Sequence, residues 1–311
     1  MKTVFMGSPS FALPALQALM SNQYDIIAVY TQPDKKTGRG QQVTACTVKQ
    51  FAVSNGLSVI QPETFRDPAQ VDRLAGLKPD IIIVAAYGQI LPDSVLQIPL
   101  YKCINIHPSL LPEYRGPSPV STAILNGDAL TGVTIMLIEK KVDSGPLIQQ
   151  REMAVADEDT TESLSGKLAG LGAEMLIETV PAWVGGEIRP WIQDESRASY
   201  TRMGSKEDGL LDWRLPALQL WRRVRAYHPW PGCYAKWRGG RLGVVQTVPL
   251  KDTGGGRVGQ VVALPRGGPA RVAVRTSDGL LGLLSVQPGG KREMSAADFV
   301  AGHKDFIGSL L

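Results

Sequence analysis

The stretch DIIIVAAYG, residues 80–88, decides the fold class of this chain. Six apolar residues follow Asp80 without interruption, and the run ends at Gly88. Such a run is typical of a strand that is buried on both faces, and strands of this kind occur mainly in parallel sheets covered by helices. A second strand of the same type is predicted at CINIHP, residues 103–108. The two stretches therefore predict an α/β fold.

The sequence around these two strands alternates between strand and helix patterns. Strands are predicted at residues 2–7, 25–32 and 57–62, and helices at residues 14–19, 47–56 and 68–77. Two further strands, at residues 131–139 and 143–155, should form a hairpin-like pair near one edge. A long helix at residues 160–184 carries an apolar face made of Leu164, Leu168, Leu171, Met175 and Leu176. This alternation predicts a Rossmann-like, mostly parallel sheet with helices on both faces.

The pattern changes after the long helix. Pro, Gly and polar residues mark residues 190–206, which predicts a linker. One helix is predicted at residues 212–227, and short β-branched runs then alternate with Gly-rich turns, as in a small OB-like β-barrel. Ser295 is the predicted N-cap of a last helix, and Trp230 and Trp237 are expected in the barrel core. The predicted organisation is a catalytic domain at 1–189, a linker at 190–206 and a barrel domain at 207–311.

The charge of the chain is uneven along its length. Residues 207–311 carry 15 Lys and Arg against 8 Asp and Glu, whereas residues 1–206 carry 18 against 21. A basic domain joined to a slightly acidic one favours a polyanionic partner for the second half. A solvated basic face would give the same composition, so charge alone leaves both interpretations open.

The apolar segments and the cysteines limit the cellular class of the protein. The sequence has no apolar run of eighteen or more residues, so no membrane span is expected. The first apolar run is broken by GSP at residues 7–9, which indicates a strand and a turn and not a secretion signal. Cys46, Cys103 and Cys233 lack metal-ligand spacing and fit free thiols in a reducing compartment. We therefore expect a cytoplasmic protein without a metal site.

Common nucleotide and hydrolase motifs are missing from the sequence. FMGSP at residues 5–9 is not G-x-G-x-x-G, and the second predicted strand ends in Thr31 and Gln32, with no acidic residue to hold a ribose. P-loop, H-E-x-x-H and G-x-S-x-G motifs are also missing. The sequence therefore argues against a nicotinamide enzyme, nucleotide phosphate transfer, zinc proteolysis and the usual serine hydrolases.

Three polar residues remain as candidates for chemistry. Asn105 and His107 are two positions apart on a predicted strand, so their side chains share a face, and Asp143 lies in the turn KKVDSGP, residues 140–146. An amide and an imidazole can stabilise a developing oxyanion, and a carboxylate can orient the imidazole or accept a proton. Without a Ser or Cys nucleophile in register, this set favours direct acyl transfer through a tetrahedral intermediate. The spacing fits equally well a strand-end His with Asn and Asp in turns.

The chain resembles the folate-dependent formyltransferases in two segments, INIHPSLLPEYRGPSPV at residues 104–120 and VDSGPLI at residues 142–148. The branch of this family that formylates methionyl-tRNA is resembled in VFMGSPSFALPAL, YTQPDKKTGRGQ, PDIIIVAAYGQILP and RAYHPWPG, so the resemblance covers nearly the whole chain. It implies transfer of the formyl group of 10-formyltetrahydrofolate to the α-amino group of methionine on initiator tRNA.

The resemblance also implies roles for individual residues. Asn105 and His107 would stabilise the oxyanion, and Asp143 would orient His107 and help to move the proton. The folate pocket would be bordered by Ser109, Leu110, Leu111 and Pro112. The pterin ring would meet the backbone of Tyr87, Gly88, Gln89, Ile90 and Leu91.

The expected tRNA contacts are basic residues in both halves. The loop PDKKTGRGQQ, residues 33–42, resembles the family's insertion into the tRNA acceptor stem. Arg39 lies between two Gly residues, which allow close approach to RNA, and Lys35 and Lys36 would attract phosphate. In the second half, the predicted tRNA-binding residues are Arg222, Arg223 and Arg225, with Lys236, Arg238 and Arg241 as further candidates.

Two other functions remain open from the sequence. A formyl-folate enzyme that acts on an amino sugar, or hydrolyses the formyl group, would share the catalytic residues, but the basic barrel and the GRG loop favour RNA. A non-catalytic RNA-binding protein would have no need of Asn105, His107 and Asp143. The expected partners are initiator methionyl-tRNA and the folate co-substrate, with no membrane partner, and the expected oligomeric state is a monomer.

Overall fold

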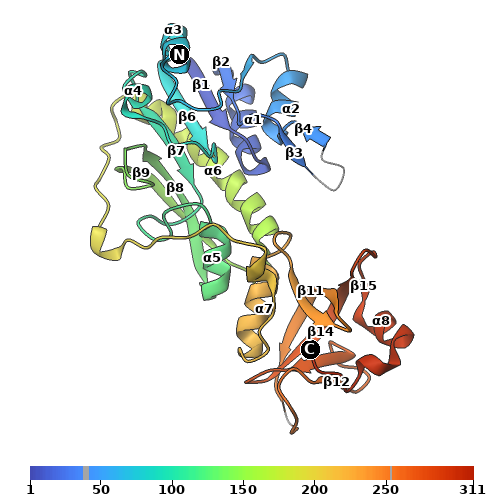
Figure 1. Cartoon of the computed structure of the whole chain (residues 1–311). Helices are drawn as coiled ribbons and strands as arrows, with labels where there is room; N and C mark the ends of the chain where they lie inside the picture. The colour runs from blue at the N-terminus through green and yellow to red at the C-terminus, as the bar shows by residue number, and fades with distance from the viewer. Residues whose placement is uncertain (38–41, 253) are drawn as a thin grey trace. The chain divides into compact units, whose positions relative to one another are not determined.

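A mostly parallel seven-stranded sheet organises the first half of the chain (Figure 1). Its order is β5-β2-β1-β6-β7-β8-β9, with β1 Lys2–Gly7, β2 Asp25–Tyr30, β5 Val59–Ile60, β6 Ile81–Ala85, β7 Cys103–His107, β8 Leu130–Leu137 and β9 Leu147–Ala154. The strands from β5 to β7 pair in parallel, and β8 and β9 add an antiparallel edge. The predicted parallel sheet and its edge hairpin are confirmed.

The structure, a computed structural model, describes residues 1–37, 42–252 and 254–311. These residues divide into two compact units. The first unit holds Met1–Pro119, Leu130–Ala154 and Ser165–Thr201, and the second holds Val120–Ala129, Val155–Leu164 and Arg202–Leu311. None of the helices in these residues combines the length and the apolar character that crossing a bilayer requires.

Helices cover both faces of the first sheet. They are α1 Leu13–Ser21, α2 Thr47–Ser54, α3 Pro68–Leu77, α4 Asp93–Leu96 and α6 Thr161–Val184. α5, Pro119–Asn126, belongs to the second unit except for its first residue. Leu74 of α3 and Val95 of α4 pack with Ile82 of β6 in one apolar cluster. On the opposite face, Ile106 of β7 lies against Gly172 of α6, where an added Cβ would come within 2.7 Å of the Ile106 side chain. The two-faced cover explains why the strands are apolar along their whole length.

The helix α3 shows why the helical segments could be located from the sequence. Asp67 caps its first turn by accepting a hydrogen bond from the N–H of Ala69 at 3.0 Å. Pro68 occupies the first helical position, where its missing N–H costs nothing. The helix ends where Lys78 adopts a φ of 51°. The observed bounds, Pro68–Leu77, are those that the sequence predicts.

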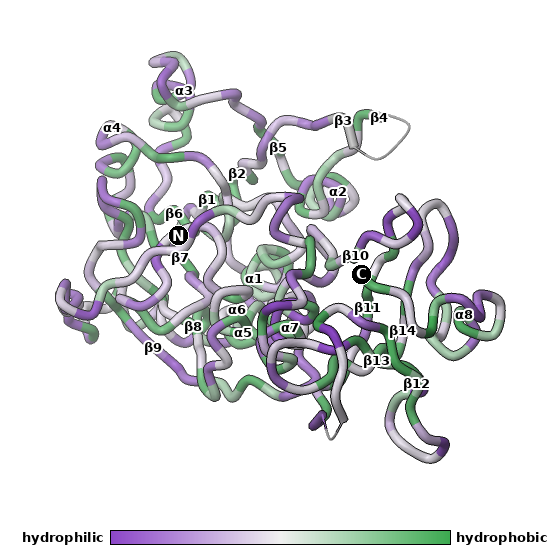
Figure 2. Tube along the Cα trace, turned by 60° about the horizontal axis from the view of Figure 1, so that its bottom comes forward, coloured by the Kyte–Doolittle hydropathy of each residue, from purple (hydrophilic) through white to green (hydrophobic). Residues whose placement is uncertain are grey.

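An antiparallel sheet of short strands organises the second unit. Its order is β10-β11-β14-β13-β12, with β15 paired to β14. The bounds are β10 Cys233–Trp237, β11 Gly240–Leu250, β12 Val261–Ala263, β13 Val272–Arg275, β14 Leu280–Pro288 and β15 Met294–Ser295. Register shifts around Gln246 bend the long strand β11, and β14 is hydrophobic over most of its length (Figure 2). The sheet curls as a half-barrel, which confirms the predicted fold class.

Two helices of this unit, α7 and α8, agree with their predicted bounds to different degrees. α7 spans Ala217–Ala226 and begins later than expected, because Pro216 has an extended backbone and the Asp212 carboxylate closes a turn with the N–H of Arg214. α8 spans Ala296–Gly302 and begins at the predicted N-cap, where the Ser295 hydroxyl accepts a hydrogen bond from the N–H of Asp298 at 3.0 Å.

The two tryptophans expected in the barrel core have different environments. Trp237 packs edge-on against Phe299 and Phe306, as predicted. Trp230 is 54 % exposed, so its predicted core position is wrong. A proline on each side of Trp230 removes the N–H groups that a strand or helix would need, and the segment therefore forms a surface turn between α7 and β10.

Residues 190–201, which the sequence analysis assigned to the linker, belong to the first unit. Trp191 and Leu147 exchange two backbone hydrogen bonds at 2.8 and 3.0 Å, and Tyr200 forms a β-bridge with Arg115. This part of the chain is therefore hydrogen-bonded to the first unit at both ends. The domain boundaries at residues 189 and 206 stay a prediction.

Candidate active site

Strand β7 carries Asn105 and His107 on one face of the first sheet, since side chains alternate along a strand. Parallel pairing with β6 places Asn105 beside Val84, and antiparallel pairing with β8 places His107 opposite Thr134. His107 is buried, at 4 % exposure, and Asn105 is half-buried. Both project near the carboxyl end of β7, the end at which parallel sheets bind ligands.

The turn between β8 and β9 brings Asp143 next to His107. Oδ2 of Asp143 lies 3.6 Å from Nδ1 of His107 and accepts a hydrogen bond from the N–H of Gly116 at 2.8 Å. Asp143 has a φ of 48°, in the left-handed region that few residues other than glycine adopt. Its carbonyl oxygen accepts a hydrogen bond from Nε2 of Gln193 at 2.9 Å, which holds the turn in this conformation. Two of the predicted catalytic residues therefore face each other.

The hydrogen bonds of His107 decide which ring nitrogen is free. Nε2 lies 3.0 Å from the carbonyl oxygen of Tyr114. Because a carbonyl oxygen only accepts, we assign the ring hydrogen to Nε2 as its donor. Nδ1 faces Asp143 at 3.6 Å, which is longer than a hydrogen bond. A substrate atom or a water molecule can therefore approach Nδ1, and a proton arriving there is attracted by the carboxylate.

The side-chain amide of Asn105 has no hydrogen-bond partner within the described part of the chain. Asn105 is half-buried, and its amide is not among the buried unpaired side-chain atoms of the described residues. Its two N–H donors are available to a ligand oxygen. The Asn105 and His107 positions are about 6–7 Å apart along the strand. An acyl group of ordinary size can contact both side chains from that distance.

The loop after β7 is the predicted folate wall of Ser109, Leu110, Leu111 and Pro112. Ser109 is fully buried, and its hydroxyl donates to the carbonyl oxygen of Glu113 at 2.6 Å. The hydroxyl of Thr134 donates to the Ser109 carbonyl at 2.6 Å and accepts from the N–H of Leu111 at 3.1 Å. Leu111 and Pro112 are buried and Leu110 is half-buried. The loop is thus fixed on β8, and its contact with folate stays a prediction.

The loop after β6 holds the other predicted folate residues, Tyr87, Gly88, Gln89, Ile90 and Leu91. Its first and last residues are buried, while Ile90 is 79 % exposed. Gly88 has a φ of 80°, and its carbonyl accepts a hydrogen bond from Nε2 of Gln32 at 2.8 Å. A Cβ at Gly88 would come within 2.7 Å of that nitrogen, so the turn requires glycine. The loop presents open backbone and an apolar side chain, and its contact with the pterin stays a prediction.

The predicted RNA contacts of the first unit lie around a small hairpin. It is formed by β3, Lys35–Thr37, and β4, Gln42–Thr44. Nζ of Lys35 donates to Oε1 of Gln32 at 2.7 Å. Lys36 lies in β3, and Arg39 lies outside the residues that the structure describes.

The three arginines of α7 bind main-chain carbonyls of the second unit. Arg222 donates to Asn126, Arg223 to Asp208 and Arg225 to Asp159, at 3.1, 2.8 and 3.1 Å. The Arg225 guanidinium also lies 3.8 Å above the Trp221 ring, and burial lowers the pKa of Arg225. These side chains stabilise their own unit, and their contact with tRNA stays a prediction.

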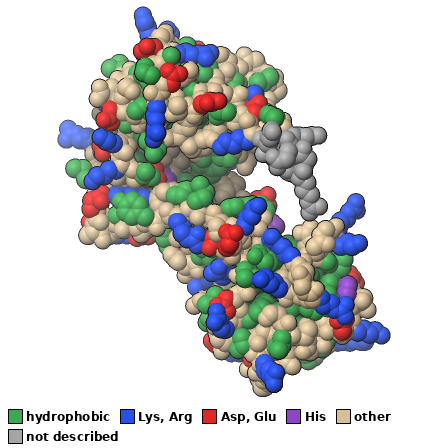
Figure 3. Space-filling model, viewed as in Figure 1, with side chains coloured by type: hydrophobic (Ala, Val, Ile, Leu, Met, Phe, Trp, Pro, Cys, Tyr) green, Lys and Arg blue, Asp and Glu red, His purple; other side chains and the backbone are tan. Residues whose placement is uncertain are grey.

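The cations of the β10–β11 hairpin are more open to solvent. Lys236 and Arg241 lie directly opposite each other in the register, and both are exposed. Arg241 lies 4.0 Å above the Tyr234 ring, and Arg238 pairs with Asp305. Lys and Arg side chains are prominent on the surface of this unit (Figure 3). Like charges directly opposite each other destabilise a sheet. An anion bound near Lys236 and Arg241 would offset this repulsion, so the hairpin suits contact with an anion.

A charged network behind the site was not predicted from the sequence. Arg115 is fully buried and donates to Gln193, Glu195 and the Tyr200 hydroxyl. Arg115 could have been noticed because it lies in the segment that follows His107, although no role was predicted for it. Gln193 and Glu195 could not have been found from the sequence. The Pro, Gly and polar residues around them indicate the local conformation of the chain and not its long-range hydrogen bonds.

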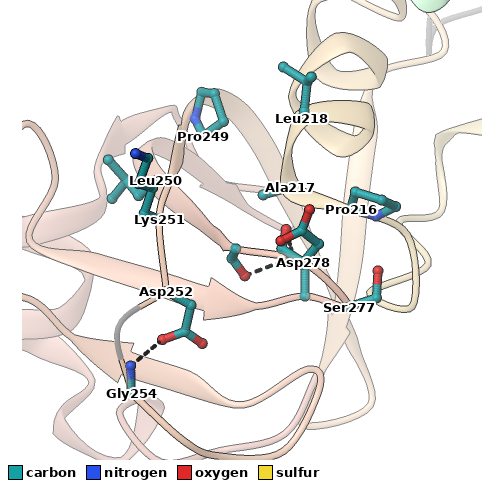
Figure 4. Close-up of a pocket in the computed structure, with 12 residues that line it drawn as sticks. Pro216, Ala217, Leu218, Pro249, Leu250, Lys251, Asp252, Gly254, Ser277 and Asp278 are labelled. Atoms are coloured by element: carbon teal, nitrogen blue, oxygen red, sulfur yellow. Dashed lines mark hydrogen bonds between the residues drawn. The ribbon is translucent and has the colours of Figure 1, made fainter.

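A surface groove of about 690 Å³ lies on the second unit (Figure 4). It lies between the start of α7 at residues 216–218, the end of β11 near Asp252, and the turn around Asp278. The Asp252 carboxylate accepts a hydrogen bond from the N–H of Gly254 at 2.9 Å. The charged residues that line the groove are Asp252, Asp278 and Lys251, so it has no excess of positive charge for a phosphate. It contains none of the predicted site residues.

The described residues contain no group of three His, Cys, Asp or Glu side chains that could hold a metal ion. Cys46, Cys103 and Cys233 are free thiols, of which the first is half-buried and the other two are buried.

Family comparisons cover both halves of the chain. The family model described as Formyl transferase matches residues 1–180, and that described as Formyl transferase, C-terminal domain matches residues 204–304. The methionyl-tRNA formyltransferase of Roseiflexus castenholzii is 48% identical over 304 residues, which cover 97% of this chain and 96% of that relative. The methionyl-tRNA formyltransferase of Chloroflexus aurantiacus is 44% identical over 308 residues, which cover 99% of both.

Solved structures with a similar fold are more distant in sequence. HypX from Aquifex aeolicus, in complex with tetrahydrofolic acid, has a TM-score of 0.67 at 19% identity, and the match covers 99% of this chain and 48% of that one. An N-formyltransferase from Helicobacter canadensis, with folinic acid and dTDP-3-aminofucose, has a TM-score of 0.67 at 17% identity, covering 91% and 99%. At these identities the likeness concerns the fold alone.

Proposed function

Since the chain belongs to the formyl transferase family, we propose that it transfers the formyl group of 10-formyltetrahydrofolate to the α-amino group of methionine on initiator tRNA. The observation that carries the proposal is the pair formed by Nδ1 of His107 and the Asp143 carboxylate, 3.6 Å apart at the end of β7. Relatives that are 44% and 48% identical over nearly the whole chain carry the name methionyl-tRNA formyltransferase, which supports the choice of acceptor.

The reaction makes an amide from an amine and a formyl group. The amine attacks the formyl carbon, and the formyl oxygen becomes the oxyanion of a tetrahedral intermediate. Asn105 donates to this oxygen, and the imidazolium that forms when Nδ1 of His107 takes the amine proton favours its charge. The amine then loses a proton, and the folate nitrogen gains one as its bond to carbon breaks. His107, oriented by Asp143, moves this proton through Nδ1, directly or through a water molecule.

The folate lies between two loops in this proposal. They are the loop of Tyr87, Gly88, Gln89, Ile90 and Leu91 and the loop of Ser109, Leu110, Leu111 and Pro112. What supports this placement is that the loops follow β6 and β7, which are neighbouring parallel strands, and that ligands of such sheets bind at the carboxyl ends. The backbone of Gly88 and the exposed side chain of Ile90 suit a flat, partly polar ring.

The tRNA contacts in this proposal come from basic side chains of both halves. Lys35, Lys36 and Arg39 meet the acceptor stem, and the exposed cations Lys236, Arg238 and Arg241 bind phosphates further along the tRNA. Arg222, Arg223 and Arg225 also face the tRNA, with a smaller share of the affinity, because their guanidinium groups already bind main-chain carbonyls.

The proposal extends to the cellular setting. Initiator tRNA is used where translation begins, so we place the protein in the cytoplasm. It acts as a monomer, with a catalytic domain at residues 1–189, a tRNA-binding domain at residues 207–311, and between them a linker at residues 190–206, of which residues 190–201 pack with the first unit.

The test compares three acceptors in one formyl-transfer assay with 10-formyltetrahydrofolate. These are initiator methionyl-tRNA, elongator methionyl-tRNA and a nucleotide-linked amino sugar. We expect formylmethionine on the initiator tRNA, with much slower transfer to the elongator tRNA. Formylation of the sugar amine without formylation of either tRNA would overturn the proposal.

A further inference from the structure

We infer that Gln193 is a positioning residue that fixes the geometry of the His107–Asp143 pair. Gln193 lies between the two regions that match the family models, residues 1–180 and 204–304. It is 4 % exposed, which is unusual for a glutamine in a segment of exposed neighbours. The kinetic test of this inference rests on the proposed function, whereas the positioning of the pair itself does not.

The side-chain amide of Gln193 uses its full hydrogen-bonding capacity. Nε2 donates to the carbonyl oxygens of Asp143 at 2.9 Å and Gly145 at 2.8 Å. Oε1 accepts from two nitrogens of Arg115, Nε at 3.1 Å and Nη2 at 2.9 Å. One side chain therefore joins the turn that carries Asp143 to the loop that carries Arg115.

The neighbours of Arg115 in the chain hold both members of the catalytic pair. The carbonyl of Tyr114 binds Nε2 of His107, and the N–H of Gly116 binds Oδ2 of Asp143. A shift of Arg115 would move both contacts. Gln193 thus acts on the pair twice, through the Asp143 carbonyl and through Arg115.

Arg115 is anchored by the same segment that carries Gln193. Its guanidinium makes two hydrogen bonds to the Glu195 carboxylate, at 2.7 and 3.1 Å, and this contact is the main cause of the lowered pKa of Glu195. The backbone N–H of Arg115 donates to the carbonyl of Ser199 at 2.9 Å, and the backbone carbonyl of Arg115 accepts from the N–H of Thr201 at 2.8 Å. The Ser199 hydroxyl accepts from the N–H of Tyr114 at 2.9 Å. The segment therefore fixes the loop through both backbone and side chain.

The strained backbone of Asp143 makes the support by Gln193 consequential. A non-glycine residue at a φ of 48° persists only where its surroundings hold it. Without the two hydrogen bonds from Gln193, the turn can relax and change the separation of Nδ1 and Oδ2. Such a change alters proton transfer more than substrate binding, because Gln193 lies behind the pair and is 4 % exposed.

The test uses Gln193→Glu, which keeps the size of the side chain and an oxygen for Arg115. It replaces the donor with an acceptor facing the two carbonyls. The matched control is Gln50→Glu, an exposed glutamine of α2 whose Nε2 also donates to a main-chain carbonyl, that of Ala45 at 2.8 Å. Both variants are made in the full chain, and circular dichroism checks that each remains folded.

We expect Gln193→Glu to lower kcat by about 10- to 100-fold, to change the pH profile of kcat, and to leave KM for folate and tRNA near wild type. Gln50→Glu should match wild type in all three measurements. An unchanged kcat for the folded Gln193→Glu protein would overturn the inference, as would an effect confined to KM.

A second readout is independent of activity. The chain has three histidines, His107, His228 and His303, so their ring protons can be resolved by NMR and assigned with His107→Ala. In Gln193→Glu the His107 signals should move while the other two stay in place. Unmoved His107 signals would overturn the inference. If the wild-type protein formylates no tRNA but the His107 signals move, the proposed function fails and the positioning role stands.

Discussion

Nδ1 of His107 and Oδ2 of Asp143 lie 3.6 Å apart, although His107 ends β7 and Asp143 follows β8. The other ring nitrogen is held by the carbonyl of Tyr114 at 3.0 Å, and Oδ2 is held by the N–H of Gly116 at 2.8 Å. Both supports come from one short loop, so the loop fixes the ring and the carboxylate together. The free nitrogen and the carboxylate face each other, and a substrate amine or a water molecule that contacts both has to approach from the side, because 3.6 Å leaves no room for an atom between them.

Loss of either member of this pair should stop catalysis without unfolding the protein. We expect His107→Ala and Asp143→Asn each to lower kcat by at least ~100-fold, the scale for losing a general acid or base. The double variant should be little worse than either single one, because the two groups act as a unit. Steady-state formylation of methionyl-tRNA measures this. Full activity in a folded His107→Ala protein with retained RNA binding would mean that the catalytic assignment of His107 is wrong.

Asn105 should contribute to rate and not to stability. Its amide has no partner among the residues described by the structure, so Asn105→Ala leaves no buried group unpaired. We expect kcat to fall about 100- to 1,000-fold, the usual effect of losing an oxyanion donor. The unfolding free energy should change by no more than about 1 kcal/mol. Urea denaturation next to the kinetic assay separates the two, and a large loss of stability would contradict the free-amide assignment.

The strands and most helices could be predicted because their signals are local. The apolar run within residues 80–88 contains the buried strand β6, Ile81–Ala85, and Asp67 and Pro68 mark the start of α3 within two residues of sequence. Trp230 was placed wrongly, because composition favours burial of tryptophan while the flanking prolines keep the segment in a surface turn.

Only those residues of the site that lie close together in the sequence could be predicted to lie together in the fold. Asn105 and His107 share a face by strand periodicity, but the approach of Asp143 depends on how β8 pairs with β7. Gln193 could not be found from its neighbourhood, since its partners Arg115 and Asp143 are far from it in sequence. Long-range hydrogen bonds leave no local pattern, and the segment around Gln193 therefore read as a linker.

The basic residues of the second unit should divide into two classes. Lys236→Ala combined with Arg238→Ala removes exposed charge, so KM for tRNA should rise and the salt dependence of binding should weaken by about 1–2 units of log–log slope. The fold should be unaffected, since exposed ion pairs contribute little to stability. Binding of tRNA at several salt concentrations measures this, and an unchanged slope would remove the hairpin from the RNA surface.

Arg225→Ala is the counterpart of that experiment within the same unit. It removes a guanidinium that lies on Trp221 and binds the carbonyl of Asp159. We expect a loss of about 1–3 kcal/mol in unfolding free energy, because a main-chain acceptor loses its partner and packing is lost. The salt dependence of tRNA binding should stay near wild type. A normal melting temperature with a reduced salt slope would instead give Arg225 a main share of the tRNA affinity.

The three cysteines should differ in reactivity in the native protein. Cys103 and Cys233 are buried, and burial raises the pKa of each thiol to about 12. Little thiolate is present at these two positions at mildly alkaline pH, whereas Cys46 is half-buried. A thiol-reactive reagent in excess should modify one thiol rapidly and the other two only after denaturation. Cys46→Ala should abolish the fast phase, and a fast phase that survives this change would contradict the assignment.

Acid should weaken the second unit through Asp208. Its carboxylate accepts hydrogen bonds from Arg202 and from the N–H of Ser205, and the contact with Arg202 is the main cause of a pKa well below the usual range for Asp208. The folded state therefore binds this proton less readily than the unfolded state does. Its contribution to stability is complete above the ordinary aspartate pKa of about 3.9 and is lost as the pH falls toward the folded value.

Asp208→Asn should accordingly flatten the dependence of unfolding free energy on pH in this acidic range, and Arg202→Met should flatten it to a similar extent. The double variant should be no flatter than either single one, since both remove the same pair. Urea denaturation followed by tryptophan fluorescence reports mainly on this unit, because four of the six tryptophans lie within residues 207–311. A wild-type pH dependence in Asp208→Asn would mean that other carboxylates, and not this pair, govern the acid sensitivity.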